Sequence, residues 1–208
     1  MRPLTDTTAK PLLKVAGKAL IEYHLEALSR AGIRQVVINH AWCGEQIEAA
    51  LGDGSHFALE IIYSPEKPYA LETAGGIVQA LPLLGQEPFI VVNGDIWTDY
   101  DFSKLQLENN MQAHIVLVDN PVQHPDGDFY FQQGQILKQG TDKLTYAGIG
   151  VYHPNLFQHY ETGRRPLAPI LRETIEQKKL SGEYFDGNWL DIGTPERLTA
   201  LDRDLSKL

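Results

Sequence analysis

Apolar and polar positions along the first half of the chain follow two periods, one typical of helices and one typical of buried strands. Apolar residues recur at helical spacing from Leu20 to Ala31, and Gly32 is well placed to end that helix. An apolar run without polar alternation, typical of a strand covered on both faces, occurs at 89–92, and Val36-Val37-Ile38 is the centre of a second predicted buried strand at 33–39. The pattern predicts helices at about 19–31, 44–51 and 73–81, the last stopped by Pro82, and strands at 33–39, 59–63 and 89–92.

Up to residue 95 these elements alternate as helix and strand, which is typical of an α/β fold, and we predict a Rossmann-like mixed, mainly parallel sheet flanked by helices. Shorter strands separated by glycines then predict a smaller β-rich region with antiparallel pairing. We place the later strands at 114–118, 128–131, 135–138, 144–152 and 183–186, and the later helices at 102–110, 167–177 and 195–206. Without a repeat or long linker, residues 1–208 are predicted to form a single domain.

The predicted strand at 89–92 is the most apolar one, and it is followed by Asn93, Gly94 and then Asp95. Ligands of open α/β sheets bind beyond the carboxyl ends of the strands, so an acid in this place is suited to hold a metal ion. Asn-Gly is also a strong hairpin turn sequence, and an aspartate beside it is compatible with ordinary turn chemistry. The residues alone leave both interpretations open.

Asp191 repeats this arrangement about a hundred residues later, between the apolar pair Trp189-Leu190 and Gly193. Two such carboxylates with room for water are a common way to hold Mg²⁺ beside substrate phosphates. The alternative is a polar residue that helps to cap the last helix, for which Thr194 is the expected cap and Pro195 the first residue.

Two further stretches have residue types suited to phosphate. Lys10, in the irregular segment 1–18, could neutralise charge at a transferring phosphorus, although a lysine in a surface loop is usually solvated. The stretch Thr73-Ala74-Gly75-Gly76 opens a helix, where small residues let a ligand approach backbone N–H groups. Glycines at a helix start also serve close packing.

Composition limits the kinds of partner. The chain has 208 residues and a formal charge of -9, and it has no basic cluster, which argues against binding of nucleic acid through its phosphates. No apolar stretch approaches the roughly 20 residues that span a bilayer. The single cysteine, Cys43, and the polar, proline-broken start are consistent with a cytoplasmic protein. Nothing in the sequence indicates an obligate protein partner.

Taken together, these motifs resemble those of the sugar-1-phosphate nucleotidyltransferases, in the order of that family and over nearly the whole chain. The matching stretches are M-R-P-L-T at 1–5, K-P-L-L at 10–13, V-A-G-K at 15–18, L-E-T-A-G-G at 71–76, N-G-D at 93–95 and W-L-D-I-G-T-P-E-R-L at 189–198. The L-E-T-A-G-G form and the compact length are most similar to the bacterial N-acetylmuramate-1-phosphate uridylyltransferases of peptidoglycan recycling. Mannose-1-phosphate guanylyltransferase-like members share much of the pattern.

The resemblance implies the nucleotide-diphospho-sugar transferase fold, with residues up to about 100 binding the nucleotide and the remainder binding the sugar. It implies nucleotidyl transfer from a nucleoside triphosphate, expected to be UTP, to a sugar 1-phosphate, with release of pyrophosphate. Asp95 and Asp191 would hold Mg²⁺, and Lys10 would contact the phosphate. The residues expected to contact the nucleotide are Ser64, Pro65, Glu66, Thr73, Ala74, Gly75, Gly76 and Asn93, and Gly148 is expected to line the sugar pocket.

The chain departs from the family pattern at its start. Members of the family begin with a buried strand and a glycine-rich loop of the form L-A-A-G-x-G-x-R, whereas this chain starts at the methionine that would follow that arginine. Absence of the strand would expose unpaired edges in the sheet. The departure leaves two expectations open: an enzyme whose upstream residues are not included in this sequence, or a homologue that binds nucleotide sugars without catalysis.

Overall fold

The structure, a computed structural model, describes residues 1–132 and 134–207. The chain divides into two compact units. Unit 1 contains Met1–Ala70, Asn93–Ser103 and Asn188–Leu208, and unit 2 contains Leu71–Val92 and Lys104–Gly187. The division of the chain into a nucleotide-binding and a sugar-binding part concerns function and stays a prediction. None of the described helices is long and apolar enough to cross a bilayer.

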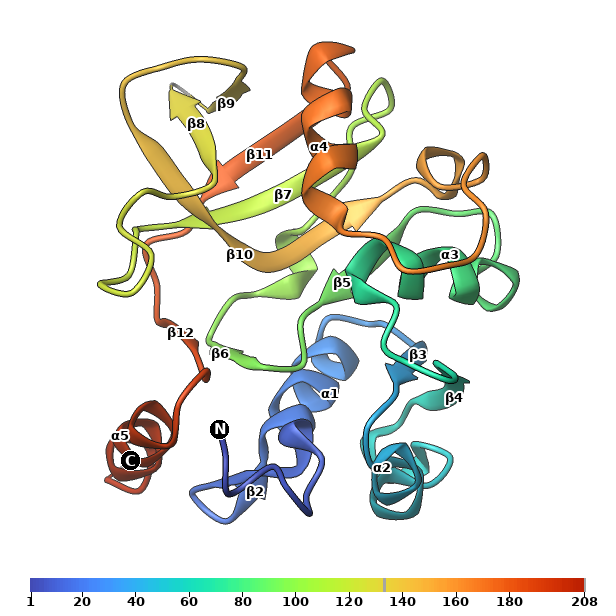
Figure 1. Cartoon of the computed structure of the whole chain (residues 1–208), viewed down its shortest axis with the longest axis vertical. Helices are drawn as coiled ribbons and strands as arrows, with labels where there is room; N and C mark the ends of the chain where they lie inside the picture. The colour runs from blue at the N-terminus through green and yellow to red at the C-terminus, as the bar shows by residue number, and fades with distance from the viewer. Residues whose placement is uncertain (133, 208) are drawn as a thin grey trace. The chain divides into compact units, whose positions relative to one another are not determined.

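Unit 1 is built from short strands and three α-helices (Figure 1). Its strands pair as β1 with β2, β3 with β4, and β6 with β12, and only the β3–β4 ladder is parallel. The elements are η1 (Lys10–Leu12), β1 (Lys14–Val15), β2 (Lys18–Ala19), α1 (Leu20–Arg30), β3 (Gln35–His40), α2 (Gly44–Leu51), η2 (Ser55–Phe57), β4 (Glu60–Pro65), β6 (Ile96–Thr98), η3 (Phe102–Lys104), β12 (Trp189–Asp191) and α5 (Pro195–Leu205), with the last residue of η3 falling in unit 2.

Two apolar clusters hold unit 1 together. In the first, Leu25 of α1 and Ile47 of α2 pack with Ile38 and Ile61 of the β3–β4 pair. In the second, α5 contributes Leu198 and Leu201, which pack with buried residues from the amino-terminal segment, among them Val15 and Leu20. The helical period predicted for α1 is therefore the period of its buried face.

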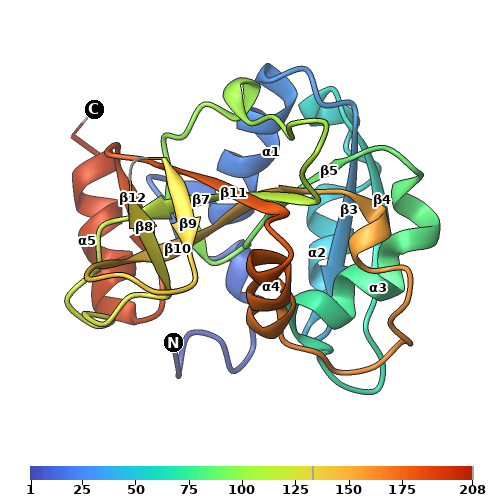
Figure 2. The ribbon, with the colours of Figure 1, turned by 90° about the horizontal axis from the view of Figure 1, so that it is seen from above.

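Unit 2 is a mixed sheet of six strands in the order β11-β7-β10-β8-β9, with β5 paired to β10 as a branch. Helices α3 and α4 lie on the same side of this sheet (Figure 2), where Ile77, Ile170 and Leu171 pack with Ile115 and Leu117 of β7. The elements are α3 (Glu72–Leu84), β5 (Phe89–Val92), β7 (Ala113–Val118), β8 (Phe129–Gln132), β9 (Gln135–Leu137), β10 (Lys143–Tyr152), η4 (Pro154–Leu156), α4 (Leu167–Glu176) and β11 (Leu180–Tyr184).

The predicted α/β fold with a mixed sheet is confirmed. Parallel ladders join β3 to β4 and β7 to β11, whereas the other ladders among the described residues are antiparallel. The expected antiparallel pairing between residues 128 and 152 is present in β8, β9 and β10. The alternation of helix and strand predicts mainly parallel pairing, but antiparallel ladders are more frequent. The reason is that the ten-residue β10 pairs along both of its edges with antiparallel neighbours.

Three predictions about single elements are wrong. The expected helix at 102–110 is only the short turn η3, since the Asp101 carboxylate accepts hydrogen bonds from the backbone and hydroxyl of Ser103 and so favours a tight turn. Pro82 lies inside α3, which continues to Leu84 and ends at Gly85. The run at 89–92 predicts a strand that is covered on both faces in a mainly parallel sheet. The strand β5 is instead partly exposed at all four residues, and its partner β10 is antiparallel.

Candidate active site

The predicted phosphate-contacting lysine and the first predicted metal acid lie against each other in unit 1. Lys10 Nζ donates a hydrogen bond to Asp95 Oδ2 at 2.8 Å. Lys10 opens η1, and Asp95 lies in the turn between β5 and β6. Strand β6 pairs with β12, so Asn93-Gly94 is not the turn of a hairpin between β5 and β6. The structure therefore excludes a β5–β6 hairpin, while Asp95 still lies in a turn, and its role as a metal ligand stays a prediction.

Asp191 is brought beside Asp95 by the β6–β12 ladder. Asp191 is opposite Ile96 in this ladder, and the backbone N–H of Ile192 donates to the carbonyl of Asp95 at 2.9 Å. The Asp191 carboxylate accepts from Arg197 Nη1 at 2.5 Å. The helix cap is Thr194, as predicted, and its hydroxyl accepts from the backbone N–H of Arg197 at 3.3 Å. Asp191 contacts the same first turn through the side chain of Arg197, and its role as a metal ligand stays a prediction.

A buried histidine fixes the strand that follows Asp95. His24 of α1 is 5 % exposed, and its Nε2 donates to the carbonyl of Ile96 at 2.9 Å. Burial is the main cause that lowers the pKa of His24, while the bond to Ile96 and the charge of Asp95 oppose it. His24 is therefore held in the neutral form that donates from Nε2.

This burial predicts a pH dependence of stability. The pKa of His24 in the folded protein is below 6.5, the value of an unperturbed histidine, so the unfolded chain binds more protons as the pH falls below 6.5. Stability is then complete above the unfolded pKa and decreases as the pH drops toward the folded pKa. We expect wild type to lose more free energy of unfolding between pH 7.5 and pH 5.5 than His24→Gln does, measured by urea denaturation. Equal losses in the two proteins would contradict the assignment.

A cavity of about 860 Å³ in unit 1 adjoins the Lys10–Asp95 pair. Lys10 and Gly193 line it, together with residues from the end of β3 and the loop after it. Trp42 in that loop is 67 % exposed, and its indole N–H donates to the carbonyl of Thr5 at 3.2 Å. The cavity therefore has a cation, a hydrogen-bonding strand end and an accessible aromatic ring at its wall, a combination suited to a phosphorylated aromatic ligand.

The predicted nucleotide-contacting residues Ser64, Pro65 and Glu66 lie at the carboxyl end of β4, beside the part of β3 that lines this cavity. Asn39 and His40 pair with Ser64 and Pro65 in the parallel ladder, and both Asn39 and His40 line the cavity. The Asn39 amide donates to the Ser64 hydroxyl at 3.3 Å, and the backbone N–H of Glu66 donates to the His40 carbonyl at 2.7 Å. Asn93 lies in the same unit, at the start of the turn that contains Asp95.

The remaining predicted site residues belong to unit 2. The beginning of α3 contains the stretch Thr73, Ala74, Gly75 and Gly76, of which the last three residues are buried. A Cβ atom on Gly75 would lie 2.2 Å from the carbonyl oxygen of Gly163, so this glycine serves close packing. That observation supports the packing alternative for Gly75.

Gly148 lies at an irregularity of β10. The register of the β10–β7 ladder shifts between Tyr146 and Gly150, and Gly148 has a φ of +74°. A positive φ is readily adopted only by glycine, which explains this residue at the bulge. The strand residues before the bulge pair with β8 and those after it pair with β5, so Gly148 marks the bend of the sheet.

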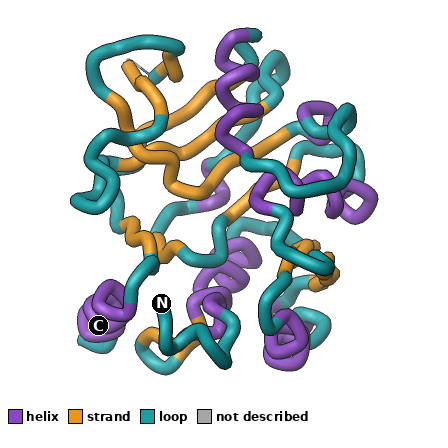
Figure 3. Tube along the Cα trace, in the orientation of Figure 1, coloured by secondary structure: helices purple, strands orange, loops and turns teal. Residues whose placement is uncertain are grey.

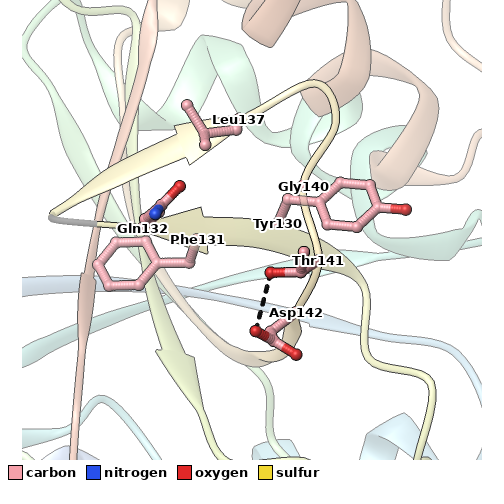
Figure 4. A pocket seen from close by; sticks show the side chains of 7 residues that line it. All are labelled: Tyr130, Phe131, Gln132, Leu137, Gly140, Thr141 and Asp142. Carbon is pink, nitrogen blue, oxygen red and sulfur yellow. Dashed lines mark hydrogen bonds between the residues drawn. The ribbon is translucent and has the colours of Figure 1, made fainter.

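A second, smaller cavity of about 70 Å³ lies in unit 2, between β8, β9 and the loop before β10 (Figure 4). Its wall includes Tyr130, Leu137 and Asp142, and the Thr141 hydroxyl donates to the Asp142 carboxylate at 2.9 Å. None of the predicted site residues lines it.

Sequence reasoning missed three residues of the Asp95–Asp191 region and its cavity. Arg197 and His24 lie on helices, where their contacts with Asp191 and Ile96 follow from packing that local sequence does not reveal. Trp42 could have been found, because it follows the carboxyl end of a predicted strand in the same way as Asp95 does.

Comparison with known proteins places the chain in a family. Residues 1–127 match the family model described as nucleotidyl transferase. The chain is 52 % identical to the N-acetylmuramate α-1-phosphate uridylyltransferase of Neisseria meningitidis over 207 residues, which cover 95 % of this chain and 90 % of that protein. It is 31 % identical to the mannose-1-phosphate guanylyltransferase catalytic subunit beta of Drosophila melanogaster, a match that covers the whole chain and 60 % of that protein.

Solved structures agree on the fold. A putative glucose-1-phosphate thymidylyltransferase from Bacillus anthracis superposes with a TM-score of 0.86 at 19 % identity, covering all of this chain and 91 % of that one. A UDP-glucose pyrophosphorylase complexed with UDP-glucose superposes with a TM-score of 0.77 at 17 % identity, covering 94 % of its chain. From the family match and the identity of 52 % over nearly its full length, the chain belongs to the nucleotidyl transferase family.

Proposed function

We propose that the protein transfers a uridylyl group from UTP to N-acetylmuramate 1-phosphate and releases pyrophosphate, as an enzyme of peptidoglycan recycling. The substrates are proposed from the relative that shares 52 % identity over 95 % of this chain. The observation that carries the reaction type is the Lys10–Asp95 pair, at 2.8 Å, next to the backbone of Asp191. Pairs of carboxylates with a lysine are suited to phosphoryl chemistry, in which positioning and charge neutralisation supply most of the catalysis.

The proposed reaction is a direct displacement at phosphorus. An oxygen of the sugar phosphate forms a bond to the α-phosphorus of UTP, the bond from that phosphorus to the bridging oxygen breaks, and pyrophosphate leaves with the electron pair. Lys10 would stabilise the negative charge on the oxygens around the transferring phosphorus. No residue of the chain needs to form a covalent bond to the nucleotide.

The donor set fits Mg²⁺. Asp95 and Asp191 offer two carboxylates on neighbouring backbone segments, and Mg²⁺ commonly binds one or two carboxylates and completes its shell with water and substrate phosphates. No group of three or more acidic, histidine or cysteine side chains suited to a metal occurs among residues 1–132 and 134–207. When bound, Mg²⁺ would neutralise phosphate charge. In the structure Lys10 donates to the Asp95 carboxylate and Arg197 donates to the Asp191 carboxylate, and these carboxylates would also be the ligands of the ion.

The other proposed contacts follow the motifs. Ser64, Pro65, Glu66 and Asn93, with the stretch Thr73–Gly76, would bound the nucleoside, and Gly148 would line the sugar pocket. The φ of +74° at Gly148 is explained by the bulge itself, so the assignment to the sugar pocket rests on the motif. The single cysteine supports a place in the reducing cytoplasm.

A second candidate is a guanylyltransferase, favoured by the 31 % identity to the mannose-1-phosphate guanylyltransferase subunit. Pyrophosphate release measured with UTP or GTP and a panel of sugar 1-phosphates distinguishes the two. We expect the highest kcat/KM for UTP with N-acetylmuramate 1-phosphate. A preference for GTP with mannose 1-phosphate would support the second candidate. Binding of a UDP-sugar without turnover would support a protein that binds nucleotide sugars without catalysis.

A further inference from the structure

The backbone of a distant loop forms hydrogen bonds with the first turn of α3. In an uninterrupted helix the N–H of Gly75 would donate to the carbonyl of Leu71. Here Gly75 N–H donates to the carbonyl of Arg165 at 3.1 Å, and the Leu71 carbonyl accepts from the N–H of Arg165 at 2.8 Å. The backbone of Arg165 thus takes both positions of the first helical hydrogen bond. We call residues 163–165 the strap.

The strap belongs to the loop between η4 and α4, which runs beside α3 (Figures 1 and 3). Its approach depends on the absence of a side chain at Gly75, where a Cβ would lie 2.2 Å from the Gly163 carbonyl oxygen and 3.1 Å from the Arg165 nitrogen. The guanidinium of Arg165 lies 4.6 Å from the centre of the Tyr160 ring, which orients the strap from its own loop.

The residue that begins α3 has an unusual backbone conformation. Glu72 has a φ of +61°, in the left-handed region that residues with a Cβ atom adopt at a cost. Its carboxylate Oε1 accepts a hydrogen bond from Arg164 Nε at 2.7 Å. The strap therefore binds the start of α3 through two sets of contacts, the backbone hydrogen bonds of Arg165 and the side-chain hydrogen bond of Arg164.

We propose that Arg164 is a positioning residue for nucleotide binding: it holds Glu72 in the left-handed conformation and thereby orients the stretch Thr73–Gly76. The inference rests on the proposed function, in which this stretch contacts the nucleoside. The side chain of Arg164 is 68 % exposed and that of Glu72 is 36 % exposed. Since exposed ion pairs contribute little to global stability, the effect of this pair should be local.

The test compares Arg164→Ala, Glu72→Gly and the double variant by calorimetric titration with UTP. Loss of the ion pair in Arg164→Ala is expected to weaken UTP binding about three- to fivefold. Glycine adopts a positive φ without steric cost, so Glu72→Gly and the double variant should bind UTP within about twofold of wild type. KM for the sugar 1-phosphate should stay unchanged in all three variants.

Lys138→Ala is the matched control, because Lys138 is also 68 % exposed and pairs with Glu176 at 2.8 Å elsewhere in unit 2. It should leave UTP binding unchanged. The proposal is overturned if Arg164→Ala binds UTP as wild type does. It is also overturned if the double variant stays as weak as Arg164→Ala, which would mean that Arg164 acts on the ligand itself.

Amide hydrogen exchange at Gly75 tests the strap independently of nucleotide. Exchange should be faster in Arg164→Ala than in wild type and should return to the wild-type rate in the double variant. Unchanged exchange in Arg164→Ala would overturn the proposal. Failure of wild type to bind UTP would instead contradict the proposed function, and the exchange measurement would still decide whether Arg164 holds α3.

Discussion

Asp95→Asn should lower kcat/KM for pyrophosphate release by at least about 1000-fold, the equivalent of about 4 kcal/mol of transition-state stabilisation. The amide would remove the charge needed to hold Mg²⁺ beside the transferring phosphate and would leave Lys10 Nζ without its 2.8 Å carboxylate partner. Stability should change little, because the two side chains are 27 % and 46 % exposed and such pairs contribute about 0–1 kcal/mol.

Asp101→Asn is a suitable control for this change. Asp101 lies six residues after Asp95, is exposed, and accepts hydrogen bonds from Ser103 at the start of η3. Its amide variant should retain activity within about twofold of wild type, as surface changes outside a site usually do. Normal turnover by Asp95→Asn, with a wild-type thermal transition, would show that Asp95 is not a metal ligand.

Lys10→Met should lower kcat by about 100- to 1000-fold while KM for UTP rises much less. The ammonium group would act on charge that develops during transfer, so its loss should affect the transition state more than the ground state. Lys14→Met is the matched control, since Lys14 lies four residues later in the same segment and is exposed. Steady-state kinetics that show a large rise in KM with unchanged kcat would assign Lys10 to substrate binding alone.

Local sequence predicts the elements of this fold better than their pairing. The period of apolar residues places α1 and α2 nearly to the residue, because each helix buries the face that the period marks. The partner of β5 could not be predicted, because both edges of β10 are available to neighbours that lie far apart in sequence. Pro82 misled the prediction for α3, which continues for two residues beyond it.

The candidate site shows the same difference between local and long-range information. The contact between Lys10 and Asp95 links residues 85 positions apart, which were selected separately, one from its residue type and the other from its place after a strand. Arg197 and His24 escaped prediction because an arginine or histidine on a helix has no distinguishing local pattern. For Gly75 the sequence allowed two explanations, and only the distance to Gly163 distinguishes them.

The most direct measurement for the proposed function follows the fate of the α-phosphorus of UTP. The protein is incubated with Mg²⁺, UTP labelled at the α-phosphate, and N-acetylmuramate 1-phosphate. We predict that the label appears in the nucleotide sugar, in a one-to-one ratio with pyrophosphate, and only when the sugar phosphate and Mg²⁺ are both present. Label in UMP, label bound covalently to the protein, or pyrophosphate released without sugar phosphate would contradict direct uridylyl transfer.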